Sequence, residues 1–199
     1  MKNISFISPF CDLLRSLNST SILGRASMKG IVKYNYLDLF SYSDDPHNRI
    51  DDYPYGGGEG MILQAQPIFS AYDSVINKTK KARVVYPTPD GEKLSMNLSL
   101  DLSKENDIIF ICGHYKGIDQ RVRDELVTDE ISIGDYILTG GELPACVITD
   151  SIVRLIPGVI NNIESAKTDS FYEDLLDCAH YTRPDVFRDL KVPDVLLSG

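Results

Sequence analysis

The chain lacks several features that would assign a protein to a class at once. It has no tryptophan, and its four cysteines (Cys11, Cys112, Cys146 and Cys178) never form a C-x-x-C pair, which argues against a zinc site or a disulfide framework. No apolar run approaches the length of a membrane span, and the apolar stretch at residues 4–7 is interrupted too soon for a signal peptide. We therefore expect reduced thiols, no membrane partner and a cytoplasmic location.

The sequence also lacks an excess of positive charge. Its 20 basic residues are outnumbered by 29 acidic ones, which gives a formal net charge of −9. Nucleic-acid-binding proteins usually present a basic field. Any contact with RNA must therefore be local, or must use residues outside this chain.

Strand-type and helix-type segments alternate along the chain, without repeats or low-complexity tracts. Residues 107–112 form the most hydrophobic run and predict a central parallel strand, whereas the Pro-Thr-Pro-Asp-Gly run at residues 87–91 predicts a turn that ends the strand before it. The alternation predicts an α/β fold with a mostly parallel sheet. We expect strands at residues 2–8, 31–36, 61–63, 83–86, 107–112 and 130–133, helices at residues 13–17, 21–29, 67–75, 96–102, 120–126 and 144–156, and a polar loop at residues 41–60.

Three glycine-bearing segments are candidates for ligand binding. Residues 55–60 (Tyr-Gly-Gly-Gly-Glu-Gly) allow close backbone approach, although a plain surface turn would look the same and the lysine of a phosphate-binding loop is absent. Residues 112–119 follow the central strand, where open α/β sheets bind ligands. Gly140 and Gly141 precede a helix with Pro144 in its first turn, so their amides could bind an adenine edge, a ribose or a carboxylate. Together they predict a pocket lined by main chain.

Two charged residues near the end of the sheet-forming region are candidates for catalysis. Arg154 follows Asp150 by four residues, a spacing that is also typical of an ion pair on one helix face. Asp169 stands where a helix cap would be equally natural. Spacing alone assigns a reaction to neither residue.

Taken together, these segments resemble the bacterial tRNA (guanine-N1)-methyltransferase (TrmD) family of the SPOUT class. The resemblance covers nearly the whole chain, and several long strings in the same order carry it. They are residues 21–26 (SILGRA), 51–52 with 54–58 and 60–61 (DD, PYGGG, GM), 112–113 with Tyr115 and 117–119 (CG, Y, GID), 132–136 (SIGDY), 140–143 (GGEL), Arg154, 157–158 (PG), 169–171 (DSF), 180–184 (HYTRP), and 192–193 with 195–196 and 198–199 (VP, VL, SG).

The resemblance implies a fold and a domain organisation that composition and periodicity do not reveal. The family has a deep trefoil knot in its sheet and forms a homodimer with the active site at the subunit interface. Residues 1–160 would be the knotted S-adenosylmethionine-binding domain, 161–170 a flexible linker and 171–199 the start of a C-terminal tRNA-binding domain. Family members continue past Ser198-Gly199 into a helical domain that grips tRNA, so this last segment is expected to be truncated.

The resemblance also implies a reaction, the transfer of a methyl group from S-adenosylmethionine to N1 of guanosine 37, preceded by another guanosine, in the tRNA anticodon stem-loop. Asp169 of the other subunit would remove the N1 proton, and Arg154 would stabilise negative charge on the guanine O6. The cofactor-binding residues would be Tyr86, Pro87, Pro89, Gly91, Gly113, Tyr115, Ile133, Gly134, Tyr136, Leu138, Gly140, Gly141 and Pro144. The substrate-binding residues would be Tyr55, Gly56, Gly57, Gly58, Asp177, His180 and Arg183.

The chain departs from the family pattern at a few positions. His114 and Lys116 stand where the family commonly has Arg and Glu, and Glu173-Asp174 where it has Asp-Gly. That Glu is linked to magnesium dependence, and a lysine cannot ligate a cation, so a magnesium ion would depend on Asp169 and Asp177. The residues themselves predict no metal site.

Three other functions remain open at this stage. One is another SPOUT RNA methyltransferase, acting on a ribose 2′-hydroxyl or a different base. A second is a module that binds cofactor or RNA without turnover. A generic nucleotide-binding α/β domain is the least favoured, because it would need a phosphate loop that the sequence lacks.

Overall fold

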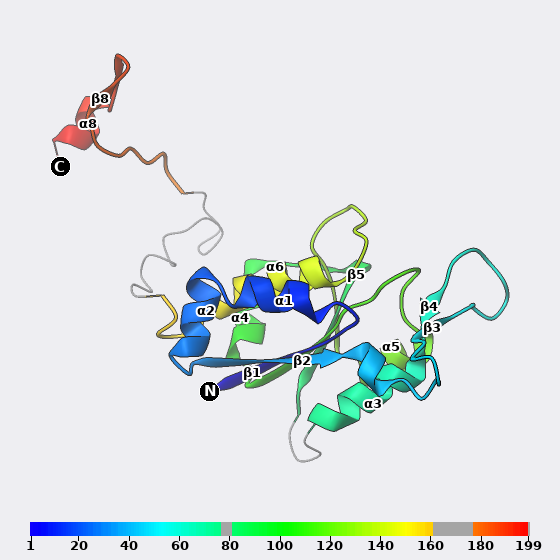
Figure 1. The fold of residues 1–199 in the computed structure, drawn as a ribbon. Coiled ribbons are helices and arrows are strands. Elements are labelled where there is room, and N and C mark those ends of the chain that lie inside the picture. Colours follow the sequence, from blue (N-terminus) through cyan, green and yellow to red (C-terminus); the bar gives the residue numbers. More distant parts are fainter. Residues whose placement is uncertain (77–80, 161–176, 199) are drawn as a thin grey trace. The chain divides into compact units, whose positions relative to one another are not determined.

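A computed structural model describes residues 1–76, 81–160 and 177–198 (Figure 1). The chain divides into two compact units, Met1–Ile163 and Glu164–Gly199. Among the described residues, no helix combines the length and the apolar character that a membrane crossing requires. The first unit contains the sheet and the candidate pocket.

A five-stranded sheet forms the centre of the first unit (Figure 1). Every pair of neighbouring strands is parallel, as the alternating pattern predicts. The order across the sheet is β2 (Val32–Asp38), β1 (Lys2–Ser8), β6 (Asp107–Ile111), β5 (Arg83–Lys93) and β7 (Asp129–Ser132).

Helices cover both faces of this sheet, because the inner strands are apolar on both sides. Along β1, Phe6 faces one cluster of buried side chains and Ile7 faces the other. Phe6 stacks between Tyr36 and Phe110, with ring centroids 5.6 and 5.3 Å away. The helices on the Phe6 side are α1 (Cys11–Asn18), α2 (Ser21–Met28), α4 (Met96–Lys104) and α6 (Glu142–Val153); those on the Ile7 side are η1 (Leu39–Tyr42), α3 (Ala65–Val75) and α5 (Gln120–Leu126).

Strand β5 does not follow the sequence-based expectation. Residues 87–91 were expected to end it, but the strand continues to Lys93. Pro87 and Glu92 both pair with Ile131 of β7, so the residues between them bulge out of the ladder. The residues expected to form a turn instead form this bulge, and the chain then rejoins the same neighbouring strand, which local sequence does not encode.

The remaining elements lie within a few residues of their expected ranges. The loop expected at residues 41–60 ends in a small antiparallel hairpin of β3 (Asp51–Asp52) and β4 (Ile62–Leu63), from which residues 53–61 project (Figure 1). The second unit contains a short hairpin, β8 (Val186–Phe187) and β9 (Leu190–Lys191), followed by α8 (Asp194–Leu197).

Arg83 at the start of β5 connects the sheet edge to a helix. Its Nε lies 2.7 Å from Asp129 Oδ2 on β7, and its Nη1 lies 2.9 Å from Asp101 Oδ2 on α4. Burial alone would raise the pKa of Asp129, but hydrogen bonds from Arg83 and Thr128 hold it below its usual value. The pair therefore stabilises the fold only while Asp129 is ionised.

We predict that Arg83→Met lowers the free energy of unfolding by about 2 kcal/mol at pH 7, because it leaves a largely buried carboxylate without its cation. A carboxylate with a depressed pKa contributes stability above its unfolded pKa of about 3.9, and loses that contribution as the pH falls through its folded value. Urea unfolding at pH 7 and at pH 3.5 should therefore show the difference from wild type narrowing in acid. Arg49→Met, which breaks a solvent-exposed pair with Asp45, serves as the control. An equal difference at both pH values would contradict this account.

Candidate active site

A pocket opens at the carboxyl ends of β5, β6 and β7. It encloses about 270 Å³ and is lined by residues 86–89, 113–117, 131–134, 136–141 and Pro144. These ranges are the bulged part of β5, the loop after β6, the end of β7 with the loop that follows it, and the start of α6. This is the edge at which open α/β sheets bind ligands.

Main chain forms much of the pocket wall, because the loops approach each other too closely for side chains. Gly141 donates its N–H to the carbonyl of Gly113 at 2.9 Å, and a Cβ on Gly141 would lie 2.8 Å from the Gly113 nitrogen. Next to this contact, His114 and Gly140 form an isolated antiparallel bridge. The loop after β6 and the loop before α6 are thus joined backbone to backbone.

The structure brings together nearly all the residues expected to bind the cofactor. Gly91 is the exception: it packs against β7, where a Cβ would lie 2.4 Å from the carbonyl carbon of Glu130. Its role is therefore to let the β5 bulge pack closely against the neighbouring strand. The others line the pocket: Tyr86, Pro87, Pro89, Gly113, Tyr115, Ile133, Gly134, Tyr136, Leu138, Gly140, Gly141 and Pro144.

Tyr86 forms the floor beside Gly113. Burial raises the pKa of its phenol, so the hydroxyl stays neutral at physiological pH. The guanidinium of Arg123 lies 5.4 Å from its ring centroid and is itself fixed by Glu130 at 2.6 Å and Asp90 at 3.0 Å. An uncharged, rigid aromatic wall of this kind suits a ligand with apolar parts.

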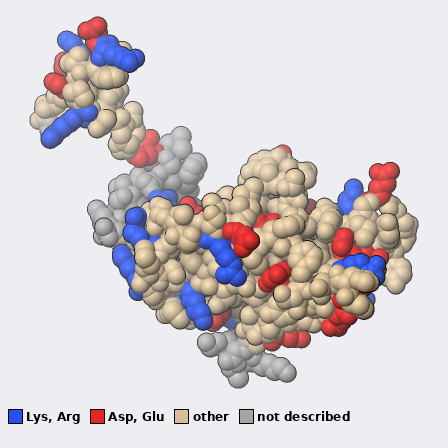
Figure 2. Space-filling view, in the orientation of Figure 1, with Lys and Arg blue, Asp and Glu red and all other residues tan. Residues whose placement is uncertain are grey.

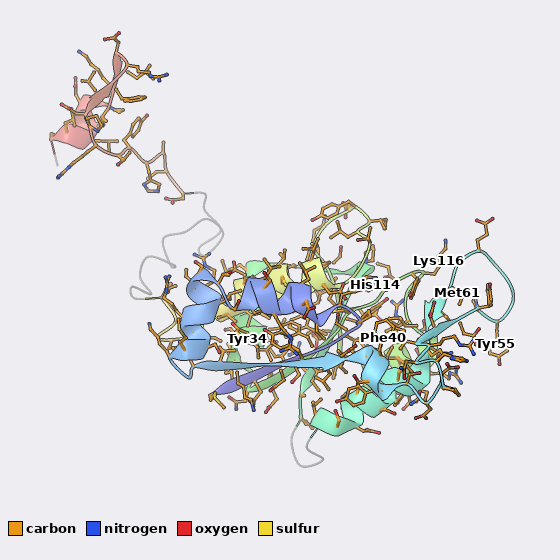
Figure 3. All side chains as sticks on the ribbon, in the orientation of Figure 1. Tyr34, Phe40, Tyr55, Met61, His114 and Lys116 are labelled. Carbon is orange, nitrogen blue, oxygen red and sulfur yellow. The ribbon has the colours of Figure 1, made fainter. Side chains whose placement is uncertain are left out.

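Lys116 connects the pocket rim to the loop that carries the expected substrate residues (Figure 3). Its backbone N–H donates to the Met61 carbonyl at 3.0 Å, and its side chain runs alongside Gly60. Tyr55 lies further out on the same loop with a fully exposed side chain. Gly56, Gly57 and Gly58 beside it all have positive φ, and none of the four lines the pocket.

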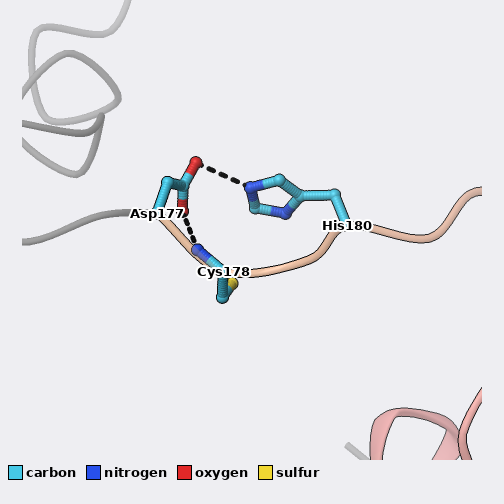
Figure 4. A group of neighbouring side chains, drawn as sticks. All are labelled: Asp177, Cys178 and His180. Atoms are coloured by element: carbon cyan, nitrogen blue, oxygen red, sulfur yellow. Dashed lines mark hydrogen bonds and ion pairs between the residues drawn. The ribbon is translucent and has the colours of Figure 1, made fainter.

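Asp177 and His180 lie together in the second unit (Figure 4). His180 Nε2 is 2.8 Å from Asp177 Oδ2, and Asp177 Oδ1 accepts the backbone N–H of Cys178 at 2.7 Å. The hydrogen bond with His180 lowers the pKa of Asp177 and raises that of His180. The side-chain atoms of Asp177, Cys178 and His180 that could ligate a metal ion lie within 4.8 Å of one another, and all three residues are exposed. Arg183, also exposed, follows on the same segment.

The two residues expected to act in catalysis are not part of this pocket as described. Arg154 caps the C-terminus of α6, at the opposite end of that helix from the pocket. Asp169 lies outside the described residues, as do residues 161–170 of the expected linker and Glu173-Asp174.

Sequence reasoning missed one member of the site. Glu142, in the first turn of α6, has a buried carboxylate within hydrogen-bonding distance of both Ser8 and His114. No spacing rule connects residues 8, 114 and 142. A glutamate directly after Gly-Gly at a helix start was the only available signal.

Charged side chains are sparse on one face of the first unit. On the face that Figure 2 shows, basic and acidic side chains are interspersed on a mainly uncharged surface, without a continuous basic field. RNA contact through this described face would therefore be local.

The architecture has a counterpart among solved structures. The crystal structure of a tRNA (m1G37) methyltransferase from Aquifex aeolicus matches it with a TM-score of 0.85 and 37% sequence identity, covering 100% of this chain and 83% of that one. The mostly parallel sheet is thus that of the SPOUT class of knotted methyltransferases.

Within that class, the family model described as tRNA (Guanine-1)-methyltransferase TrmD matches residues 1–199, and the chain belongs to this family. A tRNA (guanine-N(1)-)-methyltransferase of Shouchella clausii is 53% identical over 197 residues, which are 98% of this chain and 80% of the relative. One of Lachnoclostridium phytofermentans is 44% identical over 224 residues, covering 99% of this chain and 82% of the relative. Family membership implies a methyl donor and a tRNA substrate.

Proposed function

We propose that this protein transfers a methyl group from S-adenosylmethionine to N1 of guanosine 37 in tRNA, where another guanosine precedes it in the anticodon stem-loop. The observation that carries the proposal is the main-chain-lined pocket at the carboxyl edge of the sheet, in a chain of this family.

The residues of the pocket fit S-adenosylmethionine. Apolar side chains such as Ile133, Leu138 and Pro144 can contact the adenine faces and the ribose, while the backbone groups of residues 133–141 can hydrogen-bond their polar edges. A pocket of about 270 Å³, bounded on one side by the Gly113–Gly141 contact, would favour a bent ligand over an extended one. When bound, S-adenosylmethionine supplies a methyl carbon on a sulfonium.

Asp169 and Arg154 would act on the guanine. Its N1 carries a proton at neutral pH and is a poor nucleophile, so a base must remove that proton as the new bond forms. The carboxylate of Asp169 would take that proton, while bound S-adenosylmethionine would supply the methyl group to N1 and leave as S-adenosylhomocysteine. The guanidinium of Arg154 stabilises the charge that develops on O6, and in-line positioning supplies much of the remaining barrier reduction.

The position of Arg154 supports a homodimer with a shared active site. It ends a helix whose first residue, Glu142, is at the pocket, so the rise per residue places it about 18 Å along the helix axis. A second copy would have to supply Arg154, as it would Asp169. The paired helices α1 and α6 also expose Leu13, Leu17, Leu143 and Val147 at intervals of four residues, an apolar face suited to pairing with another copy.

Residues outside the pocket would hold the tRNA. Tyr55 and the glycines at 56–58 form an exposed, conformationally open loop tip, and Asp177, His180 and Arg183 offer charged groups in the second unit. No carboxylate lines the described pocket. A magnesium requirement, if the reaction has one, would depend on Asp169 and Asp177.

The proposal is tested by incubating the protein with radiolabelled S-adenosylmethionine and a tRNA that carries the two guanosines, then identifying the product nucleoside by mass spectrometry. We expect 1-methylguanosine at position 37, and none in a tRNA with adenosine at that position. A methyl group on a ribose or another base would instead assign a different SPOUT reaction. Cofactor binding without product would indicate a binding module.

A further inference from the structure

A buried polar chain runs behind the pocket wall and is not used by the proposed chemistry. Glu142 is 3% exposed, its Oε1 accepts from the Ser8 hydroxyl at 2.6 Å, and its Oε2 lies 2.7 Å from Nε2 of His114. A carboxylate buried to this degree is tolerated only when it is hydrogen-bonded on both oxygens. Its place in the first turn of α6 adds the favourable end of the helix dipole.

The hydroxyl of Ser8 has a defined direction. It accepts the backbone N–H of Phe10 at 2.9 Å, so its own proton is free to point at Glu142. The Phe10 ring in turn lies against the His114 imidazole, with centroids 4.8 Å apart in an edge contact. Ser8 and Phe10, at and just after the end of β1, therefore contact Glu142 and His114 respectively.

The imidazole of His114 touches the pocket wall directly. A Cβ on Gly140 would lie 2.3 Å from two of its ring atoms and 2.7 Å from Glu142 Oε2. The same wall contains the His114–Gly140 bridge and the hydrogen bond from Gly141 to Gly113. A shift of the imidazole would therefore shift the backbone groups that face the ligand.

The acceptor also fixes the state of the ring. A carboxylate acceptor at Nε2 requires a proton on that nitrogen, which fixes the orientation of the ring. A side chain at position 142 without this acceptor oxygen would let the His114 ring rotate. The position of the loop wall would then no longer be unique.

We propose that Glu142, fixed by Ser8, is a positioning residue that acts through His114 to hold the Gly113 and Gly140–Gly141 walls in the geometry that binds the methyl donor. The inference rests on the proposed function only in taking this pocket as the donor site. It assigns a positioning role to three residues, at the end of β1, in the loop after β6 and in the first turn of α6, none of which has to touch the transferred methyl group.

The test compares two buried serines. Ser8→Ala removes one hydroxyl from the chain, and Ser99→Ala removes an equally buried hydroxyl on α4 that bonds to Ser151, away from the pocket. Calorimetric titration with S-adenosylhomocysteine should give an affinity about tenfold weaker for Ser8→Ala, since it removes the hydrogen bond to the Glu142 carboxylate, and an affinity within about twofold of wild type for Ser99→Ala. Glu142→Gln keeps the size of the side chain but leaves one acceptor oxygen in place of two. It should weaken donor binding at least as much as Ser8→Ala.

A second measurement separates positioning from general destabilisation. The KM for the donor should rise about tenfold in Ser8→Ala, while kcat at saturating donor stays within about threefold, because the donor can still close the wall once it is bound. Equal affinities for Ser8→Ala and wild type, or an equal loss in Ser99→Ala, would overturn the inference. Failure of the wild-type protein to bind S-adenosylhomocysteine would instead refute the proposed donor site. Should Glu142→Gln not fold, Ser8→Ala alone decides.

Discussion

Asp169→Asn should lower the single-turnover rate of guanosine methylation by about 10²- to 10⁴-fold, the range expected when a general base is removed. Asparagine keeps the size of the side chain but cannot accept the N1 proton. Because Asp169 is not among the residues proposed to bind the donor, we expect the affinity for S-adenosylhomocysteine to be unchanged. Rapid-quench assays with labelled donor and calorimetry on the same preparation measure the two quantities.

The matched control is Asp73→Asn, which neutralises an exposed aspartate on α3 and should leave the rate unaltered. A rate within about threefold of wild type in Asp169→Asn would remove this residue from the mechanism. Loss of donor affinity together with the rate would point to misfolding instead.

Gly141→Ala is expected to reduce donor affinity by more than about 100-fold, because overpacking against fixed backbone forces the wall to move. The backbone of Gly141 is in the ordinary right-handed helical region, so alanine is not strained there by its own dihedral angles. The added Cβ would instead lie 2.8 Å from the Gly113 nitrogen and 2.9 Å from the Cys112 Cα. Titration with S-adenosylhomocysteine measures the loss.

Gly30→Ala is a suitable comparison. Gly30 has a φ of +67° and open space around its missing Cβ, so alanine there should cost about 1 kcal/mol of stability through the backbone alone. Donor affinity should nevertheless be unaffected. If Gly141→Ala and Gly30→Ala both lost affinity in proportion to the decrease in their melting temperatures, crowding of the pocket wall would not be the cause of the weaker binding.

A mixture of Asp169→Asn and Gly141→Ala also tests the shared active site. In a mixed dimer, the Asp169→Asn subunit has an intact pocket and the Gly141→Ala subunit has an intact base. If the base acts across the interface, mixing two inactive proteins restores one site in each heterodimer, about a quarter of wild-type activity for random pairing. If it acts within its own chain, mixing restores nothing.

The sequence predicted the sheet well because its parallel strands are short apolar runs bounded by turn residues. Residues 107–112 and 120–126 lie almost exclusively within a single strand and a single helix, β6 and α5. Strand β5 was predicted too short, because Pro87 and Pro89 stop a ladder locally but cannot reveal that Glu92 returns to Ile131. Register after a bulge depends on the neighbouring strand and not on the bulge residues.

The pocket could be predicted from the sequence about as well as the sheet. Glycines at 113, 140 and 141 indicated close backbone approach, and the structure places them against one another. Gly91 was assigned to the cofactor although it packs against β7, because a glycine looks the same whether it makes room for a ligand or for another strand. The buried link from Ser8 to Glu142 spans 134 positions and leaves no pattern in a single sequence.

A wall built from peptide groups has a consequence for how this site can change. A side chain that contacts a ligand can be exchanged one substitution at a time, but a carbonyl or an amide is retained whatever residue carries it. A foreign compound could bind to the same backbone groups as the natural ligand. A substitution at position 113, 140 or 141 that blocks this compound would then also block the natural ligand. An inhibitor that relies on the backbone alone would therefore meet few viable escape mutations.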